Sequence, residues 1–133
     1  MATAKYIPRP YGLDLEFFHL AIQTGKVHVQ QCVACGHYQH PPRRWCALCT
    51  SPELHFVPST GRGEVYSWTV SHFTTDSGWE GDVPYASVVV ELSEGPRLVG
   101  AFTGDPTSLT LGQSVSIRPE AKSDDFAFLW VDG

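Results

Sequence analysis

Two Cys-x-x-Cys pairs constrain this chain more than any other feature of its sequence. Cys32 and Cys35 form the first pair, Cys46 and Cys49 form the second, and ten residues separate the pairs. The chain has no other cysteine. In a reducing compartment, clustered cysteines bind metal more often than they form disulfides. Four thiolates complete a tetrahedral shell around Zn²⁺ and leave no open position. The sequence therefore predicts a structural zinc ion in a zinc ribbon.

Other uses of the same cysteines are less consistent with their surroundings. Rubredoxin-type iron also takes four thiolates, but its two pairs usually lie much farther apart. A thioredoxin-like dithiol belongs at the start of a helix that follows a strand, and Pro41 and Pro42 between the pairs do not suit that setting. A rubredoxin-like electron carrier is kept as an alternative. His37 and His40 are expected to lie outside the metal shell, since four cysteines suffice.

The chain is expected to be mainly β, with one helix near its start. Residues 13–24 are predicted to form that helix, which Gly25 terminates. Short ribbon strands are expected on both sides of the cysteines. The predicted domains are an N-terminal arm and helix, the zinc ribbon and a β-domain, at residues 1–25, 26–60 and 61–133.

The β-domain is predicted to be a five-stranded barrel of the OB-fold type. Segments of alternating or β-branched residues are separated by turns rich in Gly, Pro and Asp. In the first segment, the alternation places Tyr66, Trp68 and Val70 on one face. An open sandwich is the structural alternative. The expected strands are residues 63–74, 84–92, 97–103, 113–119 and 126–131.

Charge and hydropathy restrict the classes of partner. Fourteen acidic residues outnumber nine Lys and Arg, which gives a net charge of −5. Nucleic-acid-binding proteins usually have the opposite balance, so no nucleic acid is expected. No apolar stretch approaches transmembrane length, and no membrane contact is expected; we expect a cytoplasmic protein. A module that binds single-stranded nucleic acid remains an alternative, because Tyr66, Trp68 and His72 could stack on bases.

Several motifs in a fixed order resemble one known family. This family joins a rubredoxin-like zinc ribbon to an OB-fold, was long catalogued as a domain of unknown function, and is associated with acyl-CoA metabolism. The resemblance covers residues 11–131. The motifs are Cys-x-x-Cys-Gly at 32–36, Pro-Pro-Arg at 41–43, Cys-x-x-Cys at 46–49, Gly-Arg-Gly-x-Val-Tyr-Ser-Trp-Thr-Val at 61–70, Pro-Tyr-x-x-x-Val-Val-Glu-Leu at 84–92 and Gly-Pro-Arg-Leu-Val-Gly at 95–100.

The resemblance implies a non-catalytic accessory subunit. Members of the family accompany thiolase-like enzymes, including thiolases and aldolases that shorten steroid side chains as CoA thioesters. A hetero-oligomer with such an enzyme is therefore expected, with the acyl-CoA site shaped jointly and held mostly by the partner. The sequence agrees, because no cysteine lies outside the cluster and no Gly-x-Ser-x-Gly motif is present.

Two sets of residues are candidates for contact with CoA or with the partner enzyme. Phosphates of CoA need cations, and the candidates are Arg43, Arg44, Arg62 and Arg97, each of which could equally serve only solubility. Arg62 lies between two glycines, which allow close approach of a backbone.

For the partner interface, the candidates are Phe17, Phe18 and Trp79. The alternative for each is packing on the chain's own domain.

Overall fold

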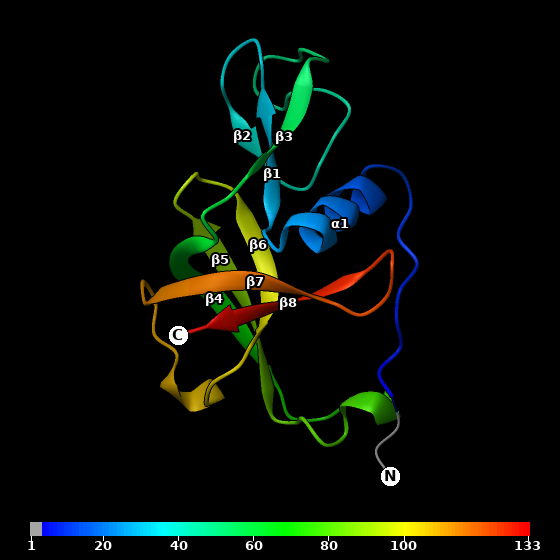
Figure 1. Cartoon of the computed structure of the whole chain (residues 1–133). Coiled ribbons are helices and arrows are strands. Elements are labelled where there is room, and N and C mark those ends of the chain that lie inside the picture. The colour runs from blue at the N-terminus through cyan, green and yellow to red at the C-terminus, as the bar shows by residue number, and fades with distance from the viewer. Residues whose placement is uncertain (1–3) are drawn as a thin grey trace.

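The chain folds as a zinc-ribbon-like sheet above a small barrel, with one helix beside both (Figure 1). The structure is a computed structural model that describes residues 4–133. Helix α1 (Gly12–Thr24) comes first, and the ribbon strands are β1 (His28–Cys32), β2 (Tyr38–Gln39) and β3 (Leu54–Pro58). The barrel strands are β4 (Arg62–Ser71), β5 (Tyr85–Leu92), β6 (Arg97–Phe102), β7 (Ser114–Ala121) and β8 (Ala127–Asp132), with 3₁₀ turns η1 (Ser77–Trp79) and η2 (Pro106–Ser108).

Helix α1 has the boundaries that its local sequence favours. Asp14 lies in the first turn, where a negative charge suits the helix dipole. Gly25 adopts a left-handed φ of 73°, and its N–H donates to the carbonyl of Ala21 at 2.8 Å. A residue with a Cβ would be strained at that φ. The predicted helix and its glycine terminator are confirmed.

The five barrel strands close in the order β4-β5-β6-β8-β7. The β6 and β8 strands pair in parallel, while the other pairs in the barrel are antiparallel. Side chains that point inward from different strands, such as Val88, Leu98 and Val131, are almost fully buried. The predicted five-stranded barrel is confirmed, although β4 ends at Ser71, three residues before the predicted end.

A β-bulge in β4 breaks the alternation that the sequence indicates. The register with β5 shifts between Val65 and Ser67. Val65 points into the core, Tyr66 is 48% exposed, and Trp68 packs against the core again. The extra residue of a bulge moves the side chains that follow it to the other face. The expectation that Tyr66 shares a face with Trp68 and Val70 is therefore wrong, while Trp68 and Val70 both pack against the core as expected.

Helix α1 lies against both the ribbon and the barrel. The ring of Phe17 is 5.1 Å from the imidazole of His40 in the ribbon segment, and the ring of Phe18 is 4.8 Å from that of Phe126 beside β8. Burial of the imidazole lowers the pKa of His40. Phe17 is only 4% exposed, and it belongs to the core that spans ribbon and barrel. Neighbouring phenylalanines of α1 thus hold the two parts together.

Truncating Phe17 should destabilise the whole chain. Phe17→Ala removes a buried ring, and we expect the free energy of unfolding to fall by about 3–5 kcal/mol. Chemical denaturation with urea measures this change. Glu16→Ala, at an exposed position of the same helix, is the matched control and should change the stability by less than about 0.5 kcal/mol. Equal effects of the two substitutions would contradict the role assigned to Phe17.

Candidate metal centre

The two cysteine pairs form backbone turns with the same hydrogen-bond pattern. The N–H of Gly36 donates to the carbonyl of Cys32, and the N–H of Thr50 donates to the carbonyl of Cys46, both at 2.9 Å. Each donor residue has a positive φ, 79° at Gly36 and 67° at Thr50. A β-branched residue rarely adopts this conformation, so the structure around Thr50 must compensate for a strained backbone. Each turn directs both of its sulfurs to the same side.

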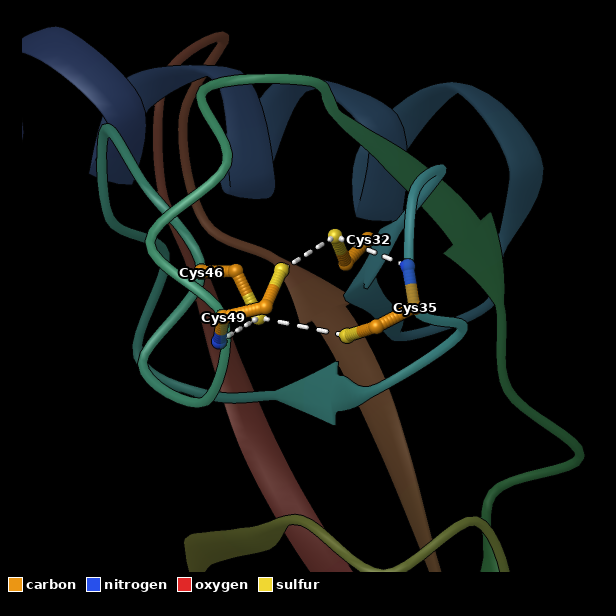
Figure 2. A group of neighbouring side chains, drawn as sticks. All are labelled: Cys32, Cys35, Cys46 and Cys49. Carbon is orange, nitrogen blue, oxygen red and sulfur yellow. Dashed lines mark hydrogen bonds between the residues drawn. The ribbon is translucent and has the colours of Figure 1, made fainter.

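The four sulfurs lie at the corners of one small site (Figure 2). The Sγ atoms of Cys32 and Cys49 are 3.6 Å apart, those of Cys35 and Cys46 are 3.7 Å apart, and all four lie within 4.8 Å of one another. A regular tetrahedron with Zn–S bonds of about 2.3 Å has sulfur–sulfur edges of about 3.8 Å. The donor set and its spacing therefore fit a tetrahedral zinc ion, with His37 and His40 outside the group.

Backbone N–H groups favour thiolates at two of the four cysteines. The N–H of Cys35 points to the sulfur of Cys32 at 3.5 Å and lowers the pKa of that thiol to about 7. The N–H of Cys49 lies at the same distance from the sulfur of Cys46 and lowers the pKa of Cys46. Thiolates are the form that binds metal. The cysteine that opens each pair is thus prepared for the ion by the turn that follows it.

Two buried glutamines hold the segment between the cysteine pairs. The Oε1 of Gln30 accepts from the N–H of Arg43 at 2.7 Å and from the Nε2 of Gln39 at 2.9 Å. The Oε1 of Gln39 accepts from the N–H of Ala47 at 2.9 Å. The segment that carries Cys46 is therefore fixed to the β1–β2 hairpin. Sequence reasoning missed both glutamines, although Gln30 shares a strand face with Cys32, two residues later.

The structure separates the four candidate arginines. Arg43 and Arg97 line one cleft of about 710 Å³ between the ribbon and the β5–β6 turn. His37, His40 and Glu94 line the same cleft. Arg97 is also held by the chain itself: its Nε donates to Glu91 at 3.0 Å, and its guanidinium stacks 3.6 Å from the ring centre of Tyr66.

Arg62 lies in a different groove, beside Glu64 and Glu91. Its flanking glycines serve the packing of the chain itself. A Cβ at Gly61 would lie 2.7 Å from the carbonyl oxygen of Ile117, and one at Gly63 would collide with the carbonyl of Glu91. The close backbone approach that the sequence indicates is thus between neighbouring strands, and the glycines give no support for a ligand at Arg62. Arg44 is exposed beside Arg43.

The three candidate interface residues also have different surroundings. Phe17 is buried, so its ring is not available to a partner. Phe18 and Trp79 are partly exposed. Trp79 rests on Tyr85, with the ring centres 4.8 Å apart, and the Nζ of Lys5 lies 4.6 Å from the ring centre of Trp79. In the part of the chain that the structure describes, no helix is long and apolar enough to span a membrane.

The metal site gives a direct chemical prediction. We expect about one zinc per chain and a colourless protein.

Gln39→Leu leaves the N–H of Ala47 without its partner, at a cost of about 1–3 kcal/mol, and should weaken zinc binding by about tenfold or more. Competition with a zinc-binding dye measures the zinc affinity of the unmodified chain and of the variant. The control is Gln31→Leu, because Gln31 makes only a 3.4 Å bond to the carbonyl of Gly36. Iron as the main metal would contradict the assignment.

Known families and proteins resemble the chain along most of its length. The rubredoxin-like zinc ribbon domain of ChsH2 matches residues 21–55, and the C-terminal OB-fold domain of ChsH2 matches residues 56–119. The 3-oxo-4,17-pregnadiene-20-carboxyl-CoA hydratase alpha subunit of Mycobacterium tuberculosis is 33% identical, over 77% of this chain and 32% of that protein. The chain spans about a third of the length of the hydratase alpha subunits that it matches.

Two further matches extend over most of both proteins. A DUF35 domain-containing scaffold protein of Methanocaldococcus jannaschii is 30% identical, over 84% of this chain and 79% of that protein. The solved structure described as Ltp2-ChsH2(DUF35) aldolase contains a chain that is 29% identical, with a TM-score of 0.82 and coverage of 94% of this chain and 97% of that one. The chain therefore belongs to the DUF35 family and combines the zinc ribbon and the OB-fold domain of the ChsH2 type.

Proposed function

We propose that the chain is a non-catalytic accessory subunit of a thiolase-like enzyme that acts on acyl-CoA. The main support is the match over nearly the full length of both chains to a chain of the Ltp2-ChsH2(DUF35) aldolase. A scaffold protein and the thiolase subunit BbsA are among the relatives. The name of the mycobacterial relative contains a steroid-type CoA ester. Retro-aldol cleavage of a steroid side chain by the partner is consistent with these names.

The geometry of the cysteine site supports a role without catalysis. All four sulfurs face one another within 4.8 Å. A zinc ion there has no open position for water or substrate, so its role is structural. Such a site contributes on the order of 10 kcal/mol to folding. The ribbon thus becomes a rigid part that can support the partner's active site and limit its access to water.

The barrel surface is less suited to nucleic acid than its fold class suggests. Residues 61–133 hold eleven of the fourteen acidic residues and only four of the nine Lys and Arg. The bulge in β4 separates Tyr66 from Trp68, and the guanidinium of Arg97 covers the ring of Tyr66. The row of stacking aromatics that a single-stranded ligand needs is therefore not formed on β4.

The cleft between ribbon and barrel is the place where this subunit meets the acyl-CoA of the partner. Arg43 and Arg97 both line it, together with two histidines. These donors suit the phosphates of CoA. Because Glu94 also lines the cleft, we place most of the CoA contacts on the partner. Micromolar binding of free CoA to the isolated chain would contradict this allocation.

Co-expression with a thiolase-like enzyme from the same organism tests the proposed function. We expect a stable hetero-oligomer in size-exclusion chromatography, and acyl-CoA turnover that is at least tenfold higher for the complex than for either protein alone. Mixing the two proteins after separate purification controls for effects of co-expression on folding. Separate elution and unchanged turnover would refute the accessory role.

The cleft assignment has its own matched pair of variants. Arg43→Ala removes a cation that lines the cleft, and we expect the KM of the complex for acyl-CoA to rise by about 3–10-fold, as lost charge-assisted hydrogen bonds weaken substrate binding. The adjacent Arg44→Ala removes the same charge and should leave KM within about twofold of the unmodified complex. Steady-state kinetics measure the KM for acyl-CoA of the complexes with each variant. Equal KM values for the two variants would contradict the assignment.

A further inference from the structure

Aromatic rings form a continuous layer on the outside of β8. Phe126, Phe128 and Trp130 lie at alternate positions, with ring centres 5.6 Å and then 6.0 Å apart. Phe18 of α1 contacts one end of this row at 4.8 Å, and Trp79 of η1 contacts Phe128 at 6.1 Å. Figure 1 shows the β7–β8 turn reaching toward α1, with η1 farther down. We name these five residues the aromatic face.

The aromatic face is only partly covered by the chain itself. All five of its residues are partly exposed. A hollow of about 270 Å³ lies among them and continues to Val99 of β6, which is 58% exposed. Small-molecule sites usually have about 300–1,000 Å³. The hollow is thus better matched to one or two side chains of another protein than to a cofactor.

Carboxylates near the residues of the aromatic face outnumber the cations there. Lys5 pairs with Asp82 at 2.6 Å, and Lys122 pairs with Glu120. Arg118 is balanced by Asp132 at 2.7 Å. Four further acids lie within three residues of Trp79 or Phe126 along the sequence, namely Asp76, Glu80, Asp124 and Asp125. Among the described residues, only Asp125 of these four forms an ion pair, with His19.

Lysines of the chain already show which groups the rings accept. The ammonium of Lys5 lies 4.6 Å from the ring centre of Trp79, and that of Lys122 lies 5.3 Å from the ring centre of Phe128. Cations are attracted to aromatic faces, most strongly where water is excluded. A second protein that presents Lys or Arg side chains would find the same rings and an excess of carboxylates around them.

We propose that the aromatic face is the docking surface for the thiolase-like partner, and that the partner presents an apolar patch with Lys or Arg side chains. This inference rests on the proposed function. Aromatic anchors in a partly closed hollow are typical of the residues that dominate binding energy. The surrounding carboxylates select a basic partner and speed its association. The face combines Phe18 and Trp79 with Phe128 and Trp130 of β8 and with Phe126, which directly precedes β8. Sequence reasoning assigned the last three to the barrel alone.

Binding of purified variants to the partner enzyme tests this assignment. Phe128→Ala should weaken the complex by about 30-fold or more, as expected for an interface anchor. Glu80→Lys combined with Asp124→Lys should weaken it by about tenfold and reduce its dependence on salt, because these exposed acids attract the partner. The dissociation constants are measured by calorimetry at 50 and 300 mM NaCl (about 14 and 6 Å of Debye screening).

Matched substitutions on β4 are the controls. Tyr66→Ala and Glu64→Lys make the same kinds of change on an exposed part of a strand that does not pair with β8, and both should bind like the unmodified chain. The charge variants test the face even if Phe128→Ala proves unstable in thermal unfolding. A stable complex that only the β4 variants weaken, or that no variant weakens, overturns this inference and leaves the accessory role intact. Absence of any complex with the unmodified chain overturns both.

Discussion

Convergence of four sulfurs on one cation is the interaction on which the ribbon depends. Its strands have five, two and five residues, and few apolar side chains of the ribbon, among them Val27 and Val29, are fully buried. A sheet this small cannot bury enough apolar surface to offset the conformational entropy of folding. Zinc binding replaces the missing core, because a metal bound only by the folded chain stabilises it by the full binding free energy.

The order imposed by the metal is passed on through directional contacts. Gln30 and Gln39 fix the segment between the cysteine pairs. Phe17 packs against His40, which directly follows the β1–β2 hairpin. On the other side, the carboxylate of Glu94 accepts from the hydroxyl of Ser59 and from the N–H of Thr60, both at 3.0 Å. The ribbon is thereby held against the β5–β6 turn, and the cleft between them has a defined shape. The boundary at residue 60 between ribbon and barrel stays a prediction.

Two surfaces with different chemistry result from this arrangement. The cleft combines arginines, histidines and one carboxylate, which suits a ligand with phosphate groups. The aromatic face on β8 combines rings with an excess of carboxylates, which suits a protein with basic side chains. Strand β6 carries both Arg97 in the cleft and Val99 beside the hollow, and the other residues of the two surfaces come from different elements. The two proposed contacts, with the substrate and with the partner enzyme, therefore lie at separate places on one subunit. The proposed accessory subunit would make both contacts without catalysing a reaction itself.

The sequence alone determined the features that depend on short spacing along the chain. Two cysteines three residues apart must converge within one turn, and a glycine after a helix can take the left-handed φ that ends it. Alternation and turn residues likewise predicted five barrel strands. Only the tertiary structure decided which distant residues meet. A single bulged residue moved Trp68 away from Tyr66. Phe17 is buried while the adjoining Phe18 stays partly exposed, and the η1 turn brings Trp79 against Phe128. Such contacts depend on register and packing over the whole fold, which local spacing does not encode.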